Sequence, residues 1–380
     1  MLKTWRTHLR SAQNVGKWHA ALSGVRRAPA RRIPEPGAVI SPQDPFTAGA
    51  EPGEEARMHY ALLLKEIARG QHGARPLSRV DSAGLFTDAL QGVMPDAVLG
   101  ALLVALRMKG ETLDELLGLH DAWQVAHAPL ALPPANDQRL PVVIGSFNGA
   151  RRQPNLLPLL ALLLTRLGLT VLIHGVRTSA GRVATREIFA ELGIETATNL
   201  AHATSALRDR RLAFVPLDVL SPSLARLLAW RDVLGVRHLG HTLVKVMNPC
   251  RGPALVIAGY THPPYRALME HYFAGIEGQA LLMRGAEGEA VASAHRLPAP
   301  LWCHGGTSTL LAGFEEARVP APCELDAVST AAFTRHALAQ PAAIPQALLA
   351  QLRAVLIASG AAPDESAAGA LLQAKIGRSG

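Results

Sequence analysis

A segment rich in glycine and arginine is the strongest candidate for chemistry in this chain. It reads Gly145-Ser-Phe-Asn-Gly-Ala-Arg-Arg-Gln-Pro-Asn155 and separates the apolar residues 141–144 from an apolar run that begins at Pro154. This order is typical of a strand, a turn and a helix with an early proline, and such turns bind phosphate. Arg151 and Arg152 favour an anion, whereas the segment contains no aspartate with which to hold a metal ion.

Further basic residues follow the next strand candidate or lie in a later helical segment. Arg177 and Arg182 belong to the first group, and Arg237, His241 and Lys245 belong to the second. Loops that follow parallel strands gather at the carboxyl edge of a sheet, so these side chains are expected to converge on a basic cleft that attracts phosphates. The alternative is that they are scattered, solvated surface charges, as most arginines are.

The elements that would position these residues can be read from the apolar periodicity. It predicts a helical domain at residues 58–130, with helices at 59–69, 82–91, 95–109 and 112–127. A proline-rich linker at 128–137 leads to strands at 142–145, 170–173, 212–215, 254–258 and 280–283, which alternate with helices. The predicted fold is α/β with a separate helical domain and a mainly parallel central sheet flanked by helices. Residues 302–307, which contain a Gly-Gly pair, are expected to form a loop.

The order of these motifs resembles anthranilate phosphoribosyltransferase, an enzyme with the glycosyltransferase family 3 fold. Its Gly-Thr-Gly-Gly-Asp diphosphate loop corresponds in position to residues 145–149, its Lys-His-Gly-Asn-Arg motif to 173–177, and its substrate-side arginine to Arg231. The segments 147–158, 181–186 and 241–249 closely resemble the YbiB-type, non-catalytic relatives of this enzyme. The resemblance implies that residues 222–247 join the helical domain, that 138–380 form the α/β domain, and that a homodimer forms through the helical domain.

The departures from the enzyme's motifs concern its metal and phosphate ligands. The hydroxyl side chains that follow the motif asparagine are replaced after Asn155 by leucines, and Ala290 and Val291 stand where the family's magnesium-binding Asp-Glu pair is expected. A magnesium-pyrophosphate reaction without these oxygen ligands lacks its main charge stabiliser. The resemblance to the YbiB-type group therefore implies no catalytic residue, no metal and no cofactor.

That group binds nucleic acid without sequence preference, which gives the first functional hypothesis: single-stranded DNA or RNA binds in the basic cleft of a disabled phosphoribosyltransferase scaffold. Aromatic residues make up only 4% of the chain, so Phe147 is the one aromatic expected to meet a base. The residues expected to contact nucleic acid are Phe147, Asn148, Arg151, Arg152, Asn155, Arg177, Arg182, His241 and Lys245. The alternative is an active glycosyltransferase or phosphoribosyltransferase with another substrate, which would need metal ligands from elsewhere, such as Glu287 or Glu289.

Composition indicates a chain that can bury a large core and does not span a membrane. It has 380 residues, 49% hydrophobic, without an apolar run long enough to cross a bilayer. Its three cysteines show no metal-ligand spacing, which favours a reducing, cytoplasmic location.

The net charge of +8 resides at the beginning of the chain. Residues 1–34 contain eight basic and no acidic residues, so the remainder sums to zero. We expect residues 1–57 to be a basic, disordered extension. Either Met58 is the natural start of translation, or the extension adds non-specific affinity for nucleic acid.

Overall fold

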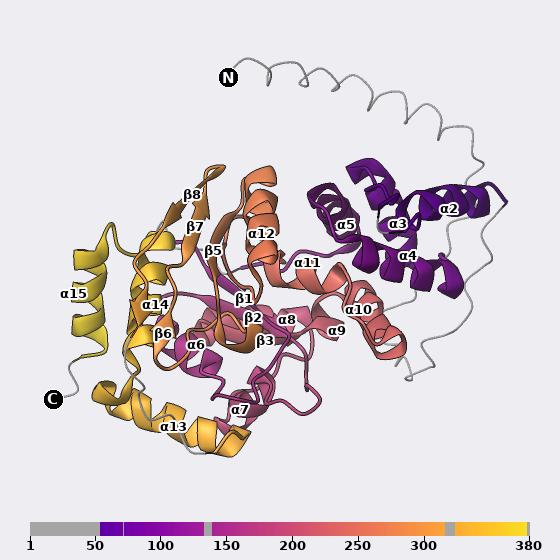
Figure 1. Ribbon diagram of the computed structural model, residues 1–380. Coiled ribbons are helices and arrows are strands. Elements are labelled where there is room, and N and C mark those ends of the chain that lie inside the picture. The colour runs from indigo at the N-terminus through magenta and orange to yellow at the C-terminus, as the bar shows by residue number, and fades with distance from the viewer. Residues whose placement is uncertain (1–53, 71, 133–138, 316–323, 378–380) are drawn as a thin grey trace, which may run out of the picture. The chain divides into compact units, whose positions relative to one another are not determined.

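The computed structural model describes residues 54–70, 72–132, 139–315 and 324–377 of the chain. The helical domain contains α2 (Glu54–Ile67), α3 (Arg79–Gln91), α4 (Asp96–Lys109) and α5 (Leu113–Ala126), as Figure 1 shows. Residues 1–53 lie outside the described residues, and so does most of the predicted extension. Residues 54–57 were expected to be disordered with it but are helical, because α2 begins at Glu54.

Local signals explain where the helices of this domain begin and how closely they pack. The Ser78 side chain caps α3 by accepting from the backbone of its first turn, and Gly92 ends α3 in a left-handed conformation. Gly118 permits the close approach of α5 to α3, because a Cβ atom there would lie 2.5 Å from the carbonyl oxygen of Arg79. The buried carboxylate of Glu115 accepts hydrogen bonds from the backbone nitrogens of Leu77 and Thr112, which fixes the start of α5.

Two helices from the middle of the chain pack on this domain, where the resemblance placed residues 222–247. They are α10 (Pro222–Leu234) and α11 (Gly240–Val246). Arg226 of α10 donates to the carbonyl oxygen of Leu90 at 3.0 Å, and Thr242 of α11 donates to Glu111 at 3.0 Å.

The α/β domain is built on a seven-stranded sheet with the order β3-β2-β1-β4-β5-β7-β8. Its first five strands in this order are parallel to one another, which confirms the predicted mainly parallel sheet. These are β1 (Val142–Ser146), β2 (Val171–Gly175), β3 (Leu212–Pro216), β4 (Leu255–Gly259) and β5 (Gln279–Met283).

The segment 302–307, which we expected to be a loop, instead forms most of a β-hairpin at the edge of the sheet. It joins β7 (Leu301–His304) to β8 (Thr307–Leu310), and β7 pairs antiparallel with β5. Gly305 and Gly306 form the turn with φ angles of 53° and 73°. A two-residue hairpin turn with positive φ at both positions matches the twist of its strands, and glycine adopts it without a steric cost. Outside this sheet, β6 (Arg296–Leu297) pairs with β9 (Phe314–Glu315).

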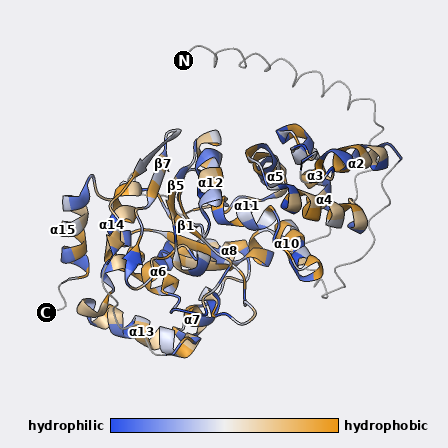
Figure 2. Cartoon of the chain, viewed as in Figure 1, coloured by the Kyte–Doolittle hydropathy of each residue, from blue (hydrophilic) through white to orange (hydrophobic). Residues whose placement is uncertain are grey.

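The strands of the sheet send alternate residues into two cores. Val143 and Val256 belong to a core shared with the helical domain, α11 and α12 (Pro263–Gly275), whereas Val142 and Ile144 pack with the helices on the opposite face. The helices of that second core include α6 (Leu157–Arg166), α13 (Ala327–Ala339), α14 (Gln346–Ala358) and α15 (Glu365–Lys375). Strands buried on both faces are largely apolar, as Figure 2 shows for the centre of the sheet.

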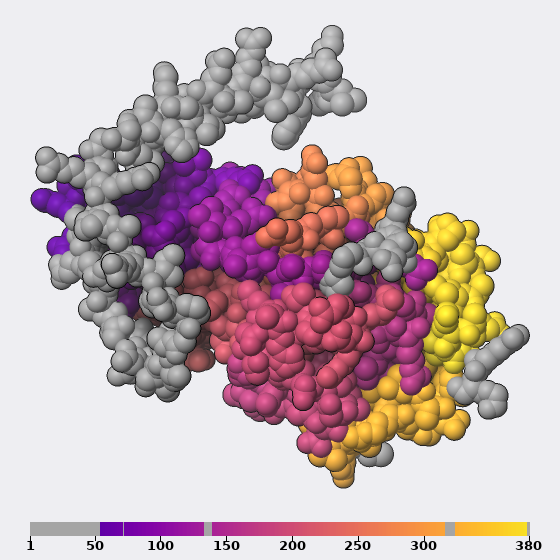
Figure 3. Space-filling model, turned by 180° about the vertical axis from the view of Figure 1, so that it is seen from behind, coloured from indigo at the N-terminus to yellow at the C-terminus, as the bar shows by residue number. Residues whose placement is uncertain are grey.

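The remaining helices of the α/β domain connect its strands. They are α7 (Thr185–Glu191), α8 (Leu200–Arg210) and α9 (Leu217–Leu220). In the space-filling view the C-terminal helices, in yellow, lie against the magenta segment that holds α6 (Figure 3). In the described part of the chain, no helix combines the length and apolar character needed to cross a membrane.

Candidate functional site

Two loops meet at the carboxyl edge of the sheet, one after β1 and one after β2. They are held together by an isolated bridge in which Ala150 and Val183 exchange both backbone hydrogen bonds, at 3.1 and 2.8 Å. The hydroxyl of Ser179 also donates to the carbonyl oxygen of Asn148 at 3.1 Å. Gly149 has a φ of 61°, and a Cβ atom there would lie 2.9 Å from the carbonyl oxygen of Val183. The first loop is therefore held in a fixed conformation by the second.

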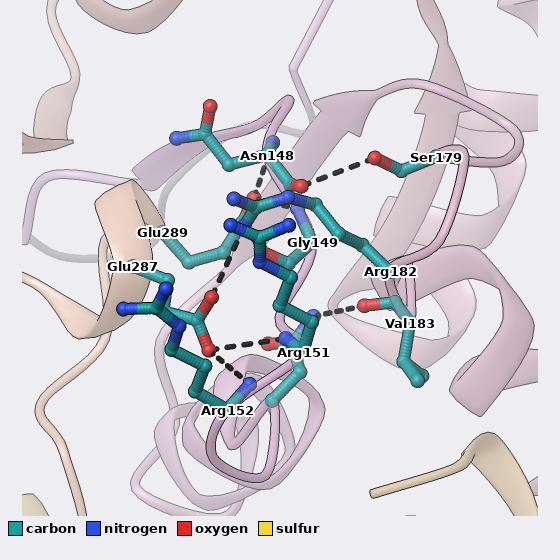
Figure 4. Close-up of polar contacts among 10 residues, drawn as sticks. Asn148, Gly149, Arg151, Arg152, Ser179, Arg182, Val183, Glu287 and Glu289 are labelled. Carbon is teal, nitrogen blue, oxygen red and sulfur yellow. Dashed lines mark hydrogen bonds and ion pairs between the residues drawn. The ribbon is translucent and has the colours of Figure 1, made fainter.

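A third loop, residues 284–291 after β5, places a carboxylate on the backbone of the first loop. Oε1 of Glu289 accepts hydrogen bonds from the backbone nitrogens of Asn148 at 2.6 Å and Gly149 at 2.8 Å (Figure 4). Glu289 is only 1% exposed, and its second oxygen, Oε2, has no hydrogen-bond partner among the described residues. The glutamate thus occupies two of the amides that a phosphate-binding loop would offer to a ligand.

Glu287 occupies two further amides of the same loop. Its Oε1 accepts from the backbone nitrogens of Arg151 at 3.0 Å and Arg152 at 2.6 Å, as the dashed lines in Figure 4 show. Its Oε2 forms an ion pair of 3.2 Å with Arg182, which also donates to the carbonyl oxygen of Gly149. No pattern in the sequence predicted these contacts, because the partners lie more than a hundred residues apart in the chain.

The predicted phosphate-binding arginines differ in how free their side chains are. Arg151 and Arg152 are exposed, and within the described part of the chain neither guanidinium has a hydrogen-bond or ion-pair partner. Arg177 pairs with Asp218 at 2.9 Å, in a contact where both side chains are about half exposed. Arg182 is held by Glu287. Arg151 and Arg152 are therefore the two predicted arginines that can bind a phosphate without first breaking an ion pair with a carboxylate.

Two predicted contact residues are buried in structural roles. Phe147 is 7% exposed, and its ring lies edge-on against His174 with centroids 5.5 Å apart, so the expected contact with a base finds no exposed face. Asn155 is 1% exposed and donates to Thr185 at 3.1 Å and to the carbonyl oxygen of Val183 at 3.3 Å. Both side chains were expected to contact nucleic acid. Because they are buried, neither can reach a ligand without breaking its present contacts.

The remaining predicted residues lie where α11 meets the sheet edge. The pKa of Lys245 is lowered to about 8 by burial and by Arg237, although Glu289 partly opposes this shift. The pKa of His241 is lowered to about 2 by burial, and further by His238, Arg237 and Arg231, so this ring is neutral near pH 7 and contributes no positive charge. Asn148 is 3% exposed, and both polar atoms of its side chain lack a partner among the described residues.

Arg237 belongs to the site although the sequence did not single it out as a contact residue. Burial, followed by the charges of Arg231 and Arg182, lowers its pKa, and Glu289 raises it. Arginine keeps its proton despite such shifts. Arg237 is therefore a fixed positive charge that acts on Lys245 and interacts with Glu289. The sequence placed it in the expected basic cleft, through its position near His241 and Lys245, but not among the contact residues.

Comparison with known proteins identifies the family of this chain. Residues 62–124 match a family model described as the helical bundle domain of a glycosyl transferase family. The uncharacterized protein YbiB of Escherichia coli strain K12 is 39% identical over 308 residues, which cover 80% of this chain and 96% of YbiB. The chain belongs to the YbiB-type relatives of anthranilate phosphoribosyltransferase.

The enzymes themselves are more distant from this YbiB-type chain. Anthranilate phosphoribosyltransferase of Shewanella sp. strain ANA-3 is 26% identical over 188 residues, which span 49% of this chain and 54% of the enzyme. The crystal structure of the Thermus thermophilus enzyme matches with a TM-score of 0.67 at 21% identity, covering 83% of this chain and 94% of that one. The Saccharomyces cerevisiae enzyme in complex with PRPP and Mg matches with a TM-score of 0.66 at 14% identity, covering 86% and 94%. These likenesses show a common fold.

The residues of the YbiB-type chain do not fit the magnesium present in that yeast complex. Ala290 and Val291, where the metal carboxylates were expected, are 1% and 0% exposed and belong to the second core. Glu287 and Glu289, the alternative ligands, each direct one oxygen to backbone amides. In the described ranges, no three His, Cys, Asp or Glu side chains group as they would in a metal site built from protein ligands alone.

Proposed function

We propose that this protein binds single-stranded DNA or RNA without sequence preference, through the basic side chains at the carboxyl edge of its sheet. The observation that carries the proposal is the pair Arg151 and Arg152, whose guanidinium groups are exposed and unpaired within the described residues. They extend from a loop that the Ala150–Val183 bridge keeps in place. Planar guanidinium groups bind phosphate oxygens bidentately, and a fixed backbone lowers the entropy lost on binding.

The same edge offers little with which to distinguish one base from another. Phe147 is buried, and the free groups are cations that contact phosphates. Binding of this kind depends on salt, because each phosphate contact releases condensed counterions. The proposed affinity therefore comes from the backbone of the nucleic acid and is similar for different sequences.

We further propose that the protein is a cytoplasmic homodimer assembled through the helical domain. Met58 and Leu62 lie one turn apart on the same face of α2, and each is 62% exposed. Large apolar side chains exposed in a stripe favour burial against a partner surface. The cytoplasmic location is supported by Cys250 and Cys303, which are buried free thiols.

The proposed function is tested by two assays on the same preparation. Labelled single strands of two unrelated sequences are titrated by fluorescence anisotropy at two salt concentrations. Magnesium-dependent release of diphosphate from phosphoribosyl diphosphate is measured beside them. We expect sequence-independent, salt-sensitive binding and no diphosphate release. Absence of binding at low salt, or turnover that a chelator abolishes, would contradict the proposal.

A further inference from the structure

Four backbone amides of the first loop converge on two carboxylate oxygens of the third loop. Asn148 and Gly149 donate to Glu289, and Arg151 and Arg152 donate to Glu287, all at 2.6 to 3.0 Å. Adjacent backbone N–H groups that point to one place form an anion-binding site. Two such pairs occur here, and the amide of Ala150 between them is bonded to Val183 instead. In this chain, the carboxylates of Glu287 and Glu289 occupy that site.

The backbone of the third loop is shaped to deliver both glutamates. Gly288, which separates them, has a φ of 91°, and a Cβ atom there would lie 2.3 Å from Nδ2 of Asn148. Glu287 itself adopts a φ of 52°, a left-handed conformation that costs energy in a residue other than glycine. Such a conformation persists only when surrounding contacts determine it, and here those contacts are the amides of Arg151 and Arg152 together with the Arg182 ion pair.

Charge makes these contacts selective as well as structural. Glu289 is buried, and its free oxygen Oε2 carries negative charge beside the amides of Asn148 and Gly149. A second anion at the same amides would have to displace this carboxylate or lie against it, and like charges at such a distance repel strongly in a partly desolvated site. The backbone amides of the first loop could otherwise bind a diphosphate. Here a carboxylate already occupies them, and its negative charge repels a second anion.

We propose that Glu287 and Glu289 are an internal anion that closes the backbone phosphate site of residues 147–152 to free diphosphates and phosphate esters. A nucleic-acid phosphate is then left to the outward guanidinium groups of Arg151 and Arg152. This second statement rests on the proposed function, whereas closure of the amides does not.

The test removes the internal anion and asks whether an external one takes its place. Glu287→Ala, Glu289→Ala and Glu289→Gln are made in the Arg151→Ala/Arg152→Ala background, which keeps the backbone amides but lacks the two guanidinium groups. Inorganic pyrophosphate is the probe, and calorimetry and thermal unfolding are the readouts. Glutamine is the matched control, because its amide oxygen still accepts from Asn148 and Gly149 without carrying a charge.

We expect the background protein to show no more than marginal pyrophosphate binding, and Glu289→Gln, which loses the charge but still occupies the amides, to gain much less affinity than Glu289→Ala. Glu289→Ala should unfold at a lower temperature, regain stability as pyrophosphate is added, and bind it at least tenfold more tightly than the background does. Glu287 is 12% exposed and so less deeply buried, and its alanine variant carries the same test if Glu289→Ala does not fold. Folded alanine variants without a gain in pyrophosphate affinity would overturn the proposal, as would a background protein that already binds as tightly. Nucleic acid is absent from the experiment, so its outcome is independent of the proposed nucleic-acid binding.

Discussion

Arg182 and Glu287 form an ion pair of 3.2 Å between the second and third loops of the sheet edge. The side chain of Arg182 is 25% exposed and that of Glu287 12%, so the contact is more shielded from solvent than a surface pair. A phosphate that approaches Arg182 has to compete with this carboxylate. The loops of this sheet edge thus contain arginines of two kinds: Arg177 and Arg182 pair with carboxylates, whereas Arg151 and Arg152 have no such partner among the described residues.

This difference predicts unequal effects of arginine substitutions on nucleic-acid binding. Arg182→Ala should leave the salt slope for single-strand binding unchanged, because the side chain it removes neutralises Glu287 and not a phosphate. Thermal unfolding should occur at a lower temperature, since Glu287 loses a partner. Anisotropy titrations across a salt series measure the slope. A decrease as large as that of a free arginine would show that Arg182 contacts nucleic acid.

The second prediction concerns catalysis. Ala290 and Val291 are buried in the core where the metal carboxylates were expected, so anthranilate phosphoribosyl transfer and magnesium-dependent binding of phosphoribosyl diphosphate should both be absent. The check is formation of phosphoribosyl anthranilate with a functional enzyme as positive control. Saturable turnover that disappears on chelation would refute this prediction and favour the alternative of an active transferase.

The third prediction is a pH dependence that originates in Lys245. Burial, and then the charge of Arg237, lowers its pKa in the folded chain to about 8 from an ordinary 10.5, while Glu289 partly opposes this shift. The affinity for single strands should therefore be constant below about pH 7 and fall as pH rises through 8, where the ammonium group loses its proton. No step is expected near pH 6, because the pKa of His241 is about 2.

Lys245→Met provides the comparison for this pH dependence. It should lower the affinity at pH 7 and remove the decrease above pH 8, as followed by anisotropy at constant ionic strength. The depressed pKa means that the charged lysine destabilises the fold most below pH 8 and not at all above pH 10.5. The variant should therefore be more stable than the parent at pH 7, and the two should converge as the pH rises. An unaltered pH profile in Lys245→Met would assign the titration to another group.

The fourth prediction concerns assembly through α2. Met58→Asp/Leu62→Asp should convert a homodimer to a monomer, because the two exposed positions lie on one face of the helix. Light scattering at micromolar concentration measures the mass. The matched control is Leu310→Asp, which changes an exposed leucine of β8 in the α/β domain. A parent protein that is already monomeric would contradict the dimer proposal.

The sheet could be predicted from the sequence because its signals are local. Five apolar runs bounded by turn residues predicted the five parallel strands. The helix expected from Pro154 onward does form, but it begins at Leu157. The β7–β8 hairpin was missed because the Gly305-Gly306 pair was interpreted as a loop without weighing the strand pattern on both sides. A Gly-Gly pair between two short β-prone segments is a hairpin signal.

The sequence predicted which loops form the candidate site, but it did not predict the contacts of their side chains. The loops after β1 and β2 do meet, since consecutive parallel strands bring their carboxyl ends together. Burial of Phe147 depends on its packing against His174, and the attachment of Glu289 to Asn148 depends on how β5 is placed in the sheet. Both are tertiary contacts, which leave no periodic trace in the chain.

The basic extension offers a competing source of affinity, because residues 1–34 carry a charge equal to that of the whole chain. Removing residues 1–57 would also cut into α2, so the truncation is made at residue 53 to keep that helix. We expect most of the affinity to remain, because the proposal assigns binding to the free guanidinium groups of Arg151 and Arg152, which the truncation keeps. Loss of all binding would assign the function to the extension.

The central claim is tested most directly by the salt dependence of single-strand binding in two matched arginine pairs. Arg151→Ala/Arg152→Ala removes the free guanidinium groups, and Arg208→Ala/Arg210→Ala removes two exposed arginines at the C-terminal end of α8, which precedes the amino end of β3. Both variants change the net charge equally. The account predicts that the first weakens binding to all sequences and lowers the salt slope by roughly 0.7 for each lost phosphate contact, whereas the second leaves the slope unchanged. Equal effects of the two variants, or an unchanged slope in Arg151→Ala/Arg152→Ala, would contradict it.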